Sequence, residues 1–341
     1  MSLLSKQASS ENGSFYVLQT PNSGEPFYHI GGLFLDESSI KGRAGFFSTY
    51  DRSNEQSLGS VEAVLDVEAL SAYLKKGASS AELIVSCNFD GKKAYEKIFT
   101  DIQEEMALGS LKKAVLFSSS VVQGVSFPTK KDFFAYALKL LQKNKNGYLF
   151  GFYNPHLKHA YLGVSPEFLC REQDGVKYTT AVAGTKTNEE SELEWSDKLL
   201  QEHKLVQNGI ERAYEVEWSG VDSHSYGNLR HLKSEGVLKT SETVAEISSK
   251  LHPTSAVGAL PQDQSYEHKF GDLSLKERSH FGGYASLFKQ AESFSLVTIR
   301  GIEWSNDKST VCIGGGVLPE SNLEEEWLEL ENKWKTFKSL W

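Results

Sequence analysis

The sequence has few cysteines, and they are not arranged to bind a metal. Cys87, Cys170 and Cys312 are the only three in 341 residues, and they lie far apart. The chain contains neither a C-x-x-C pair nor an H-E-x-x-H run, which excludes the common zinc sites. We therefore expect three reduced thiols in a cytoplasmic protein.

Signals for membranes and nucleic acids are missing as well. The start of the chain lacks the apolar centre of a signal peptide, and no apolar run reaches the roughly 18 residues of a membrane span. Lysine and arginine number 36 against 45 acidic residues, which gives a net charge of −9. Without a basic surplus the chain is not expected to bind nucleic acid or an anionic membrane, although a few local cations could hold an anionic substrate.

Nucleotide-binding and serine-hydrolase signatures are also absent. The chain contains no G-x-x-x-x-G-K-[ST] loop and no G-x-S-x-G elbow. Gly314, Gly315 and Gly316 form a run, but no G-x-x-G continuation opens a helix after it, so it is not a dinucleotide fingerprint. Three glycines do let a backbone approach a ligand closely.

The sequence does hold enough apolar residues for a sizeable core. Hydrophobic residues make up 39% of the chain and aromatic residues 11%. Short apolar runs between turn signals predict strands, and runs with helical spacing predict helices. The predicted strands are 15–19, 26–30, 32–35, 44–51, 113–118, 148–153, 159–164, 167–172, 176–182, 227–238, 296–302 and 310–318. The predicted helices are 94–108, 131–144, 191–218, 241–251 and 322–341, and 61–75 is either a helix or a strand followed by a helix.

The order of these elements indicates an α+β fold. Strands outnumber helices and come in runs, unlike the alternating strands and helices of a parallel sheet. The four strands between 148 and 182 are predicted to form a meander. No repeat, low-complexity tract or linker divides the chain, so we expect residues 1–341 to form one domain.

Two predicted helices carry acidic residues beside an apolar stripe. Glu202 lies at the edge of the stripe of helix 191–218, where an inward carboxylate must be paired or bind a metal. In the last helix, Glu326, Glu329 and Lys333 flank a stripe of Trp and Leu. The alternative for Glu202 is a side chain that reaches solvent at the rim of the stripe. The alternative for the residues of the last helix is an ordinary solvated flank with Glu–Lys pairs. Carboxylates from two helices would suit Mg²⁺.

Two basic positions also invite a functional interpretation. Lys112 and Lys113 open an apolar run, and one of them must point inward if the strand is buried on one face. A partly buried lysine has a lowered pKa and can act as a base, whereas a solvated strand end is the alternative. Arg300 ends another apolar run and is expected to pair with a carboxylate of the protein or of a ligand. The stretch 165–167 by itself is a turn before a strand.

Taken in order, ten short motifs resemble those of the chorismate-binding enzyme family and, within it, the isochorismate synthases. They span roughly residues 109–333, about two thirds of the chain. The motifs are Leu108-Gly109-Ser110-Leu111-Lys112-Lys113-Ala114-Val115-Leu116, Ser165-Pro166-Glu167, Ala183-Gly184-Thr185, Glu202-His203, His231-Leu232, Leu251-His252-Pro253-Thr254, Phe281-Gly282-Gly283, Ile299-Arg300, Gly314-Gly315-Gly316 and Glu326-x-x-Glu329-x-x-x-Lys333.

The resemblance implies the fold of anthranilate and isochorismate synthases. That fold is an antiparallel β-sandwich core flanked by helices, with the active site in the cleft between the core sheets and the helices. Residues 109–341 would be the motif-bearing catalytic portion. Residues 1–108 would complete the core.

The resemblance also implies a site for chorismate, a dicarboxylate, and for Mg²⁺. Glu202 and Glu329 would hold the ion against the ring carboxylate, with Glu326 nearby or acting through a water. Arg300 and the amides of the glycine run would take the enolpyruvyl carboxylate. The substrate-binding residues would be Thr185, Gly184, His231, Arg300, Gly314, Gly316, Lys333 and Phe281.

The implied reaction is the reversible conversion of chorismate to isochorismate. Lys113 resembles the general base that activates water to attack C2, and Glu167 resembles the general acid that protonates the departing C4 hydroxyl. Relatives that use ammonia generally lack a lysine at the position that Lys113 occupies here. Aminodeoxychorismate synthases are expected to have a nucleophilic lysine at the position of Ala183. The loop 251–257 is similar to that of isochorismate synthases. A water-using enzyme needs no glutaminase subunit, and we expect a monomer.

Phe281 departs from the family pattern, and this departure bears on two alternative functions. Phe281 stands where many members, including salicylate synthases, have tyrosine, and the lost hydroxyl removes a hydrogen bond worth about 1 kcal/mol. This disfavours the first alternative, a salicylate synthase that adds a lyase step. The second alternative is a catalytically silent chorismate-binding relative. The resemblance leaves open whether the product would enter menaquinone or siderophore biosynthesis.

Overall fold

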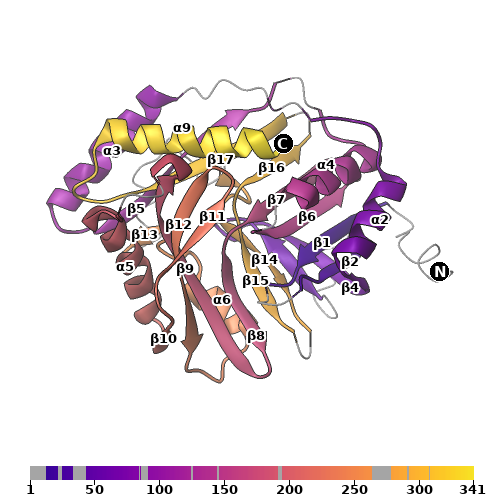
Figure 1. Ribbon diagram of the computed structural model, residues 1–341, viewed down its shortest axis with the longest axis horizontal. Coiled ribbons are helices and arrows are strands. Elements are labelled where there is room, and N and C mark those ends of the chain that lie inside the picture. Colours follow the sequence, from indigo (N-terminus) through magenta and orange to yellow (C-terminus); the bar gives the residue numbers. More distant parts are fainter. Residues whose placement is uncertain are drawn as a thin grey trace.

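The computed structural model describes most of the chain. The described residues are 13–21, 25–33, 44–83, 85, 91–123, 126–143, 146–190, 194–262, 278–289, 292–306 and 308–341. Within these ranges, 17 strands form one continuous hydrogen-bonded network, and helices pack against it (Figure 1). The expected α+β class is confirmed, and the two predicted layers are joined in one antiparallel sheet.

The strands are β1 (Phe15–Gln19), β2 (Tyr28–Leu33), β3 (Gly45–Ser48), β4 (Glu55–Leu65), β5 (Lys113–Val121), β6 (Tyr148–Asn154), β7 (His159–Ser165), β8 (Phe168–Gln173), β9 (Val176–Thr187), β10 (Val216–Trp218), β11 (Asp222–Tyr226), β12 (Leu229–Leu238), β13 (Ala259–Leu260), β14 (Gly283–Leu287), β15 (Phe294–Thr298), β16 (Gly301–Ser305) and β17 (Lys308–Val317). The α-helices are α2 (Val67–Gly77), α3 (Lys92–Ala107), α4 (Lys130–Lys143), α5 (Asp197–Glu211), α6 (Val244–Leu251) and α9 (Leu323–Leu340).

Four of the described helices, α2, α5, α6 and α9, begin where a polar side chain caps them. The Ser196 side chain accepts a hydrogen bond from the Leu199 amide at the start of α5. Asn322 accepts from the amides of Glu324 and Glu325 at the start of α9. These bonds satisfy donors that a helix leaves unpaired at its N-terminus, so they fix the first residue of each helix.

One predicted helix is too long. The structure ends α5 at Glu211, and Val216–Trp218 pairs with β12 as a strand instead of continuing the helix 191–218. Gly236 of β12 lies opposite, where a Cβ would come within 2.4 Å of the Val216 side chain. A β-branched and an aromatic residue alternating across a strand fit this half-buried surface better than another helical turn would.

The predicted meander is confirmed at its two ends, where β6 pairs with β7 and β8 pairs with β9, but it is wrong at its centre, because β7 and β8 are not paired in the described structure. β7 pairs with β16, and β8 pairs with β15. The predicted single strand 296–302 is in fact these two strands, β15 and β16, interrupted at Arg300. Val164 donates its amide to the Arg300 carbonyl at 3.4 Å, and Val297 donates to the Glu167 carbonyl at 3.2 Å. Two neighbouring chain segments therefore break at the same level, and Glu167 and Arg300 lie at that shared break.

The N-terminal strands are part of the same sheet. β1 pairs with β6, and β3 pairs with β14. The two predicted strands 26–30 and 32–35 are the single strand β2, and 61–75 is a strand followed by a helix. Cys170 and Cys312 are buried thiols. Cys87 lies outside the described residues.

The largest apolar cluster lies between the sheet and helices α2, α3, α4 and α9. Its largest fully buried side chain is that of Trp304, and the α9 residues Leu330 and Trp334 belong to the same cluster. The predicted apolar stripe of the last helix is thus confirmed, and it holds α9 across β17 (Figure 1). This packing brings Glu329 and Lys333, which flank the stripe, beside the glycine run.

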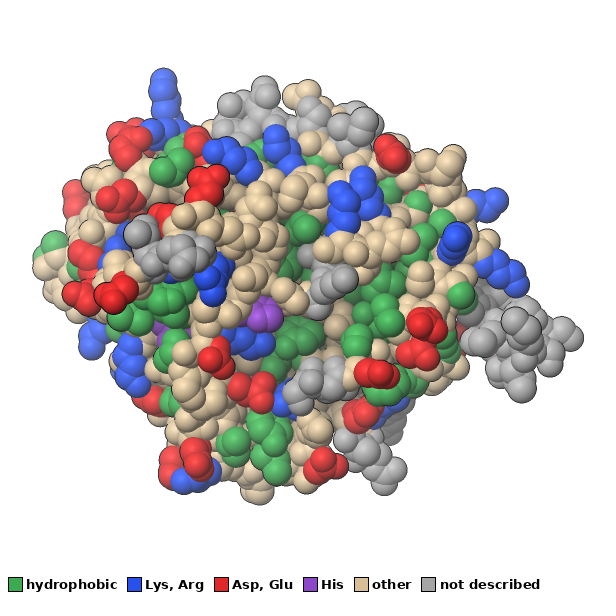
Figure 2. Space-filling model, in the orientation of Figure 1, with side chains coloured by type: hydrophobic (Ala, Val, Ile, Leu, Met, Phe, Trp, Pro, Cys, Tyr) green, Lys and Arg blue, Asp and Glu red, His purple; other side chains and the backbone are tan. Residues whose placement is uncertain are grey.

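Charges are spread over the surface. Acidic and basic side chains are interspersed on the face shown in Figure 2. In the described part of the chain, no helix is both long and apolar enough to cross a membrane.

Candidate active site

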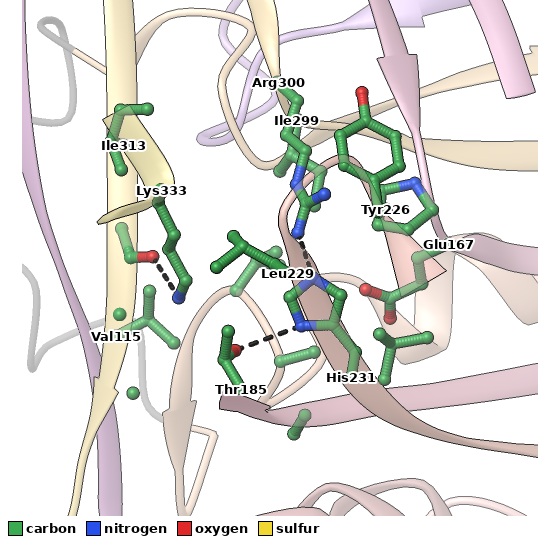
Figure 3. Close-up of a pocket in the computed structure, with 18 of the residues that line it drawn as sticks. Val115, Glu167, Thr185, Tyr226, Leu229, His231, Ile299, Arg300, Ile313 and Lys333 are labelled. Carbon is green, nitrogen blue, oxygen red and sulfur yellow. Dashed lines mark hydrogen bonds between the residues drawn. The ribbon is translucent and has the colours of Figure 1, made fainter. Parts of the chain in front are cut away.

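A pocket lies between β5, β9, β12, β17 and α9 and collects most of the predicted site residues. The predicted residues that line it are Glu167, Gly184, Thr185, Glu202, His231, Phe281, Arg300, Gly314, Gly316 and Lys333. Figure 3 shows Arg300, His231 and Thr185 in a row, with Lys333 on the other side of the pocket. Lys113 lies directly behind the lining, next to Glu202.

Lys113 is the inward member of the lysine pair, whereas Lys112 is exposed. Its side chain is 1% exposed, and its Nζ donates to the Ser255 carbonyl at 2.6 Å. Burial lowers the pKa of Lys113, and the nearby Glu202 carboxylate, 3.5 Å from Nζ, opposes that shift. A lysine that loses its proton readily in a dry site can serve as a base.

Glu167 has the opposite property. It is 2% exposed, and burial raises its pKa to about 8, against the opposing field of Lys113. Its Oε1 is buried without a hydrogen-bond partner among the described residues. The Ser165 hydroxyl and the Glu167 backbone hold the turn in place, since the Glu167 amide donates to Ser165 Oγ at 3.2 Å. A carboxyl that keeps its proton at neutral pH can act as an acid.

Arg300 and His231 form a polar row with Thr185. Arg300 Nη2 is hydrogen-bonded to His231 Nε2, and His231 Nδ1 lies 3.0 Å from Thr185 Oγ1. A guanidinium can only donate, so Nε2 accepts and Nδ1 carries the proton that is donated to Thr185. Burial and Arg300 hold the pKa of His231 well below its usual value, which agrees with a neutral ring.

Tyr226 is a pocket residue that the sequence did not predict. The Arg300 guanidinium lies 4.0 Å from the centre of its ring, within the range of a cation–π contact. Arg300 Nη1 is buried and has no hydrogen-bond partner in the described part of the chain. Its backbone has φ +59°, a left-handed conformation that turns the side chain out of the strand line. One edge of the guanidinium is therefore available to an anion.

The glycine run leaves room for charged side chains. A Cβ at Gly316 would come 2.1 Å from Glu202 Oε1 and 2.8 Å from Lys113 Nζ, so only glycine fits there without displacing them. Glu202 Oε2 in turn accepts the Gly184 amide at 3.1 Å. Gly184 has φ +77°, and a Cβ on it would come 2.8 Å from the carbonyl oxygen of Leu199.

Lys333 and Glu329 approach the same run from α9. Lys333 Nζ donates to the Gly314 carbonyl at 2.9 Å and lies 2.6 Å from Glu329 Oε1. A Cβ at Gly315 would come 3.6 Å from that carboxylate oxygen. Glu202 and Glu329 thus reach adjacent glycines from two different helices.

Glu326 is placed differently from the other two predicted metal ligands. It is 1% exposed, its Oε1 lies 2.6 Å from Lys198 Nζ, and Ser321 donates to the same oxygen at 2.6 Å. Burial, followed by repulsion from Glu329, raises its pKa to about 7. Glu326 therefore links α9 to α5, and it does not line the pocket.

The implied Mg²⁺ can be tested against these donors. Glu202 and Glu329 offer hard carboxylate oxygens beside glycines that leave space for a ligand, which fits an ion that takes one or two protein carboxylates plus substrate and water. Each carboxylate faces a lysine instead, Lys113 or Lys333. The three predicted carboxylates do not converge as one cluster within the described residues.

The described residues contain one compact set of metal-capable side chains, and it lies outside the pocket. His159, His280 and Glu303 bring one ligand atom each within 4.8 Å of the others. Each imidazole nitrogen lies 2.7 or 2.8 Å from Glu303 Oε1. Two atoms on one tetrahedral zinc would lie about 3.3 Å apart. The observed separations are those of hydrogen bonds.

Comparisons with known proteins identify the family of the chain. A family model described as chorismate binding enzyme matches residues 41–339. The isochorismate synthase MenF of Haemophilus influenzae is 26% identical over 317 residues, covering 88% of this chain and 71% of that protein. The chloroplastic isochorismate synthase of Catharanthus roseus is 25% identical over 308 residues, covering 84% of this chain and about half, 52%, of that protein.

Solved structures share the fold. The menaquinone-specific isochorismate synthase MenF from Escherichia coli superposes with a TM-score of 0.74 at 21% identity, covering 100% of this chain and 91% of that one. A putative 2,3-dihydroxybenzoate-specific isochorismate synthase, DhbC from Bacillus anthracis, has a TM-score of 0.73 at 21% identity, covering 99% and 98%. Because the family model spans most of the chain and these structures confirm its fold, the chain belongs to the family of chorismate-binding enzymes.

Proposed function

We propose that this protein converts chorismate reversibly to isochorismate with the help of Mg²⁺. The observation that carries the proposal is a pair of buried groups at one pocket whose pKa values are shifted in opposite directions. Burial lowers the pKa of Lys113 and raises that of Glu167 to about 8. Both shifts are toward the neutral form, which is the form that a base and an acid need before they react.

Lys113 acts as the base. Its neutral amine donates one hydrogen to the Ser255 carbonyl, which orients the remaining lone pair. That lone pair takes a proton from water as the water oxygen bonds to C2 of the ring. This role agrees with the likeness to the two curated isochorismate synthases.

Glu167 acts as the acid. As the ring double bond shifts, the C4–O bond breaks, and Glu167 gives its proton to the departing hydroxyl, which leaves as water. One water enters and one leaves, so the product is an isomer of the substrate. The reverse reaction uses the same two groups in exchanged roles.

The substrate's two carboxylates need separate partners in an acidic protein. The free edge of Arg300 would hold the enolpyruvyl carboxylate, together with amides of Gly314 and Gly316, while Lys333 would face a substrate oxygen. The row through His231 to Thr185 keeps Arg300 from turning and lines the ring with Gly184 and Phe281. Because these groups already hold the substrate in place, less translational and rotational entropy is lost on reaching the transition state.

Mg²⁺, when bound, neutralises the ring carboxylate of the dianion. We propose Glu202 and Glu329 as its ligands, and Glu326 as a residue that keeps α9 close to α5 beside them. The nucleophile is water and not ammonia, so the protein works without a glutaminase subunit.

The product identifies the reaction. Purified protein with chorismate and Mg²⁺ should yield isochorismate at equilibrium with chorismate, and isochorismate as the starting substrate should yield the same mixture. Liquid chromatography with mass detection checks both directions. Salicylate together with pyruvate would identify a salicylate synthase instead, and chorismate binding without turnover would identify a silent relative.

A further inference from the structure

A buried cluster of titratable residues lies outside the roles described so far. Glu303 on β16 points to the same face of the sheet as His159 on neighbouring β7. His280 and Ser279 approach Glu303 from the segment that precedes β14. The side chains of Glu303 and His280 are 11% and 2% exposed.

Glu303 accepts hydrogen bonds from every side. Its Oε1 receives one each from His159 Nε2 at 2.7 Å, His280 Nδ1 at 2.8 Å and the Ser279 hydroxyl at 2.7 Å. Its Oε2 lies 3.4 Å from the His280 amide. Burial alone would raise the pKa of Glu303, but the two imidazoles hold it well below its usual value. The carboxylate is therefore charged, and it is the one acceptor that these donors share.

The donors belong to the segment that carries Phe281 into the pocket. Ser279 has φ +46°, a conformation that costs a non-glycine residue about 1 kcal/mol or more and persists only where the surroundings hold it. The hydroxyl and the ring of two consecutive residues, Ser279 and His280, converge on Glu303. The next residue is Phe281, which lines the pocket and whose ring lies 5.9 Å from that of the buried Phe117.

The same segment is tied to the strand that leads into Arg300. The Thr298 hydroxyl donates to the His280 carbonyl at 2.6 Å, and the Gly282 amide donates to the Thr298 carbonyl at 2.8 Å. Thr298 is two residues before Arg300. A shift of this segment would therefore reach both the aromatic wall and the anion-binding arginine.

We propose that Glu303 is a positioning residue that holds the segment 278–283 on the sheet through Ser279 and His280, and so sets the place of Phe281 in the pocket. The effect on catalysis rests on the proposed function, because Phe281 matters only if the ring of the substrate packs beside it. The clamp itself is a property of the fold and can be measured without substrate.

The first test measures the clamp by hydrogen exchange. In Glu303→Gln the amides of residues 281–283 should exchange roughly tenfold or more faster than in the wild type, because opening of the segment costs less. Glu172→Gln is the matched control, since Glu172 is also a strand carboxylate, paired with Lys177 at 2.9 Å on the hairpin β8–β9. It should leave these amides unchanged. Unchanged exchange in folded Glu303→Gln would overturn the proposal.

A second variant covers the case in which Glu303→Gln does not fold. His159→Gln removes one donor at a side chain that is 16% exposed. It should accelerate exchange of the same amides, by a smaller factor. If His159→Gln folds and protects the segment as the wild type does, the cluster is not a clamp.

The third test asks whether Glu303 acts through Phe281. Glu303→Gln should lower kcat/KM for chorismate about tenfold in the wild type, but less than twofold in Phe281→Ala, where the wall is already lost. Equal losses in both backgrounds would overturn the link to the pocket. If the wild-type protein leaves chorismate unchanged, the proposed function is overturned instead. The hydrogen-exchange measurement would still decide independently whether Glu303 holds the segment.

The last arm concerns metal. Co²⁺ added to the full-length protein should give no stoichiometric tetrahedral absorption that depends on Glu303, because the ligand atoms are at hydrogen-bond separations. A one-to-one Co²⁺ spectrum that is lost in Glu303→Gln would show a metal site and overturn the clamp.

Discussion

Glu167 and Lys113 differ in charge type, but burial shifts both toward their neutral forms. Removing water from a carboxyl raises its pKa, and removing water from an ammonium lowers it. Lys113 is the largest charge that opposes the shift of Glu167, and Glu202 is the largest charge that opposes the shift of Lys113, but burial outweighs both. Burial in one closed pocket therefore moves both groups toward the forms that an acid and a base need.

The acid gives the reaction a pH limit. Glu167 must carry its proton, and its pKa is raised to about 8, so kcat/KM should fall by up to tenfold per pH unit above about pH 8. Initial rates between pH 6.5 and 9.5 check this. In Glu167→Gln the rate should drop by roughly 10²–10⁴-fold, and this descending limb should vanish. A limb that persists in the variant would assign it to another group.

Gly316 should tolerate no side chain. Gly316→Ala would place a Cβ 2.1 Å from Glu202 Oε1, so Glu202 and Lys113 must move, and kcat should fall by roughly 10²-fold. Gly220 is the control, because a Cβ there meets nothing within 4 Å, and Gly220→Ala should leave kcat unchanged. Steady-state kinetics with circular dichroism decide the point. A fully active Gly316→Ala would remove this contact from the mechanism.

Residue chemistry can be predicted from sequence where the motif itself carries it. Lys113, Glu167 and Arg300 were assigned from such motifs, and the structure brings them to one pocket. Tyr226 and Glu303 were missed, because their roles depend on partners from distant segments. A tyrosine before a turn and a glutamate within an apolar strand have no local pattern that names Arg300 or His280 as the partner.

At the scale of elements, α5 and α9 place the acidic side chains. Each helix packs its apolar stripe on the sheet and turns a polar flank toward the glycine run. Lys198 and Glu326 join the two helices at 2.6 Å. The position of Glu329 therefore depends on how stable the first turn of α9 is and on how α9 packs against the sheet.

The cap of α9 should affect both stability and substrate binding. Asn322→Ala removes an acceptor of two amides, so the free energy of unfolding should fall by about 1 kcal/mol. The loosened first turn should also raise KM for chorismate or the Mg²⁺ requirement. Thr243→Ala is the matched control, because Thr243 caps α6, which does not line the pocket. Urea unfolding should show similar losses in both variants. A raised KM in both would show that the effect is not local to α9.

Element types were largely predictable, and strand pairing was not. Hydrophobic spacing located most helices and strands, since those patterns are local. The predicted pairing of β7 with β8 was wrong because hydrophobic alternation does not indicate which strand lies next to which. β7 and β8 each pair with a strand more than a hundred residues away. The over-long helix failed where helical spacing and strand alternation coincide, at Val216–Trp218.

For the whole molecule, removal of metal should abolish activity without unfolding the chain. Glu202 accepts the Gly184 amide and Glu329 pairs with Lys333, so both carboxylates keep a partner when no ion is bound. EDTA should stop turnover, and Mg²⁺ should restore it. The melting temperature should fall by no more than the few degrees that ligand linkage gives. Calorimetry with and without EDTA measures this, and a collapse of the folded state would make the ion structural.

The pairing of early strands with late ones has a consequence for synthesis on the ribosome. Ala114 of β5 pairs with Val317 of β17, and Gly163 of β7 pairs with Gly301 of β16. When β5 and β7 leave the ribosome, each therefore has an edge with unpaired backbone groups, because its partner strand is synthesised much later. Open edges invite pairing with other chains. The nascent protein should thus depend on chaperones until β16 and β17 emerge, and its active site can form only after β17 and α9 have been made.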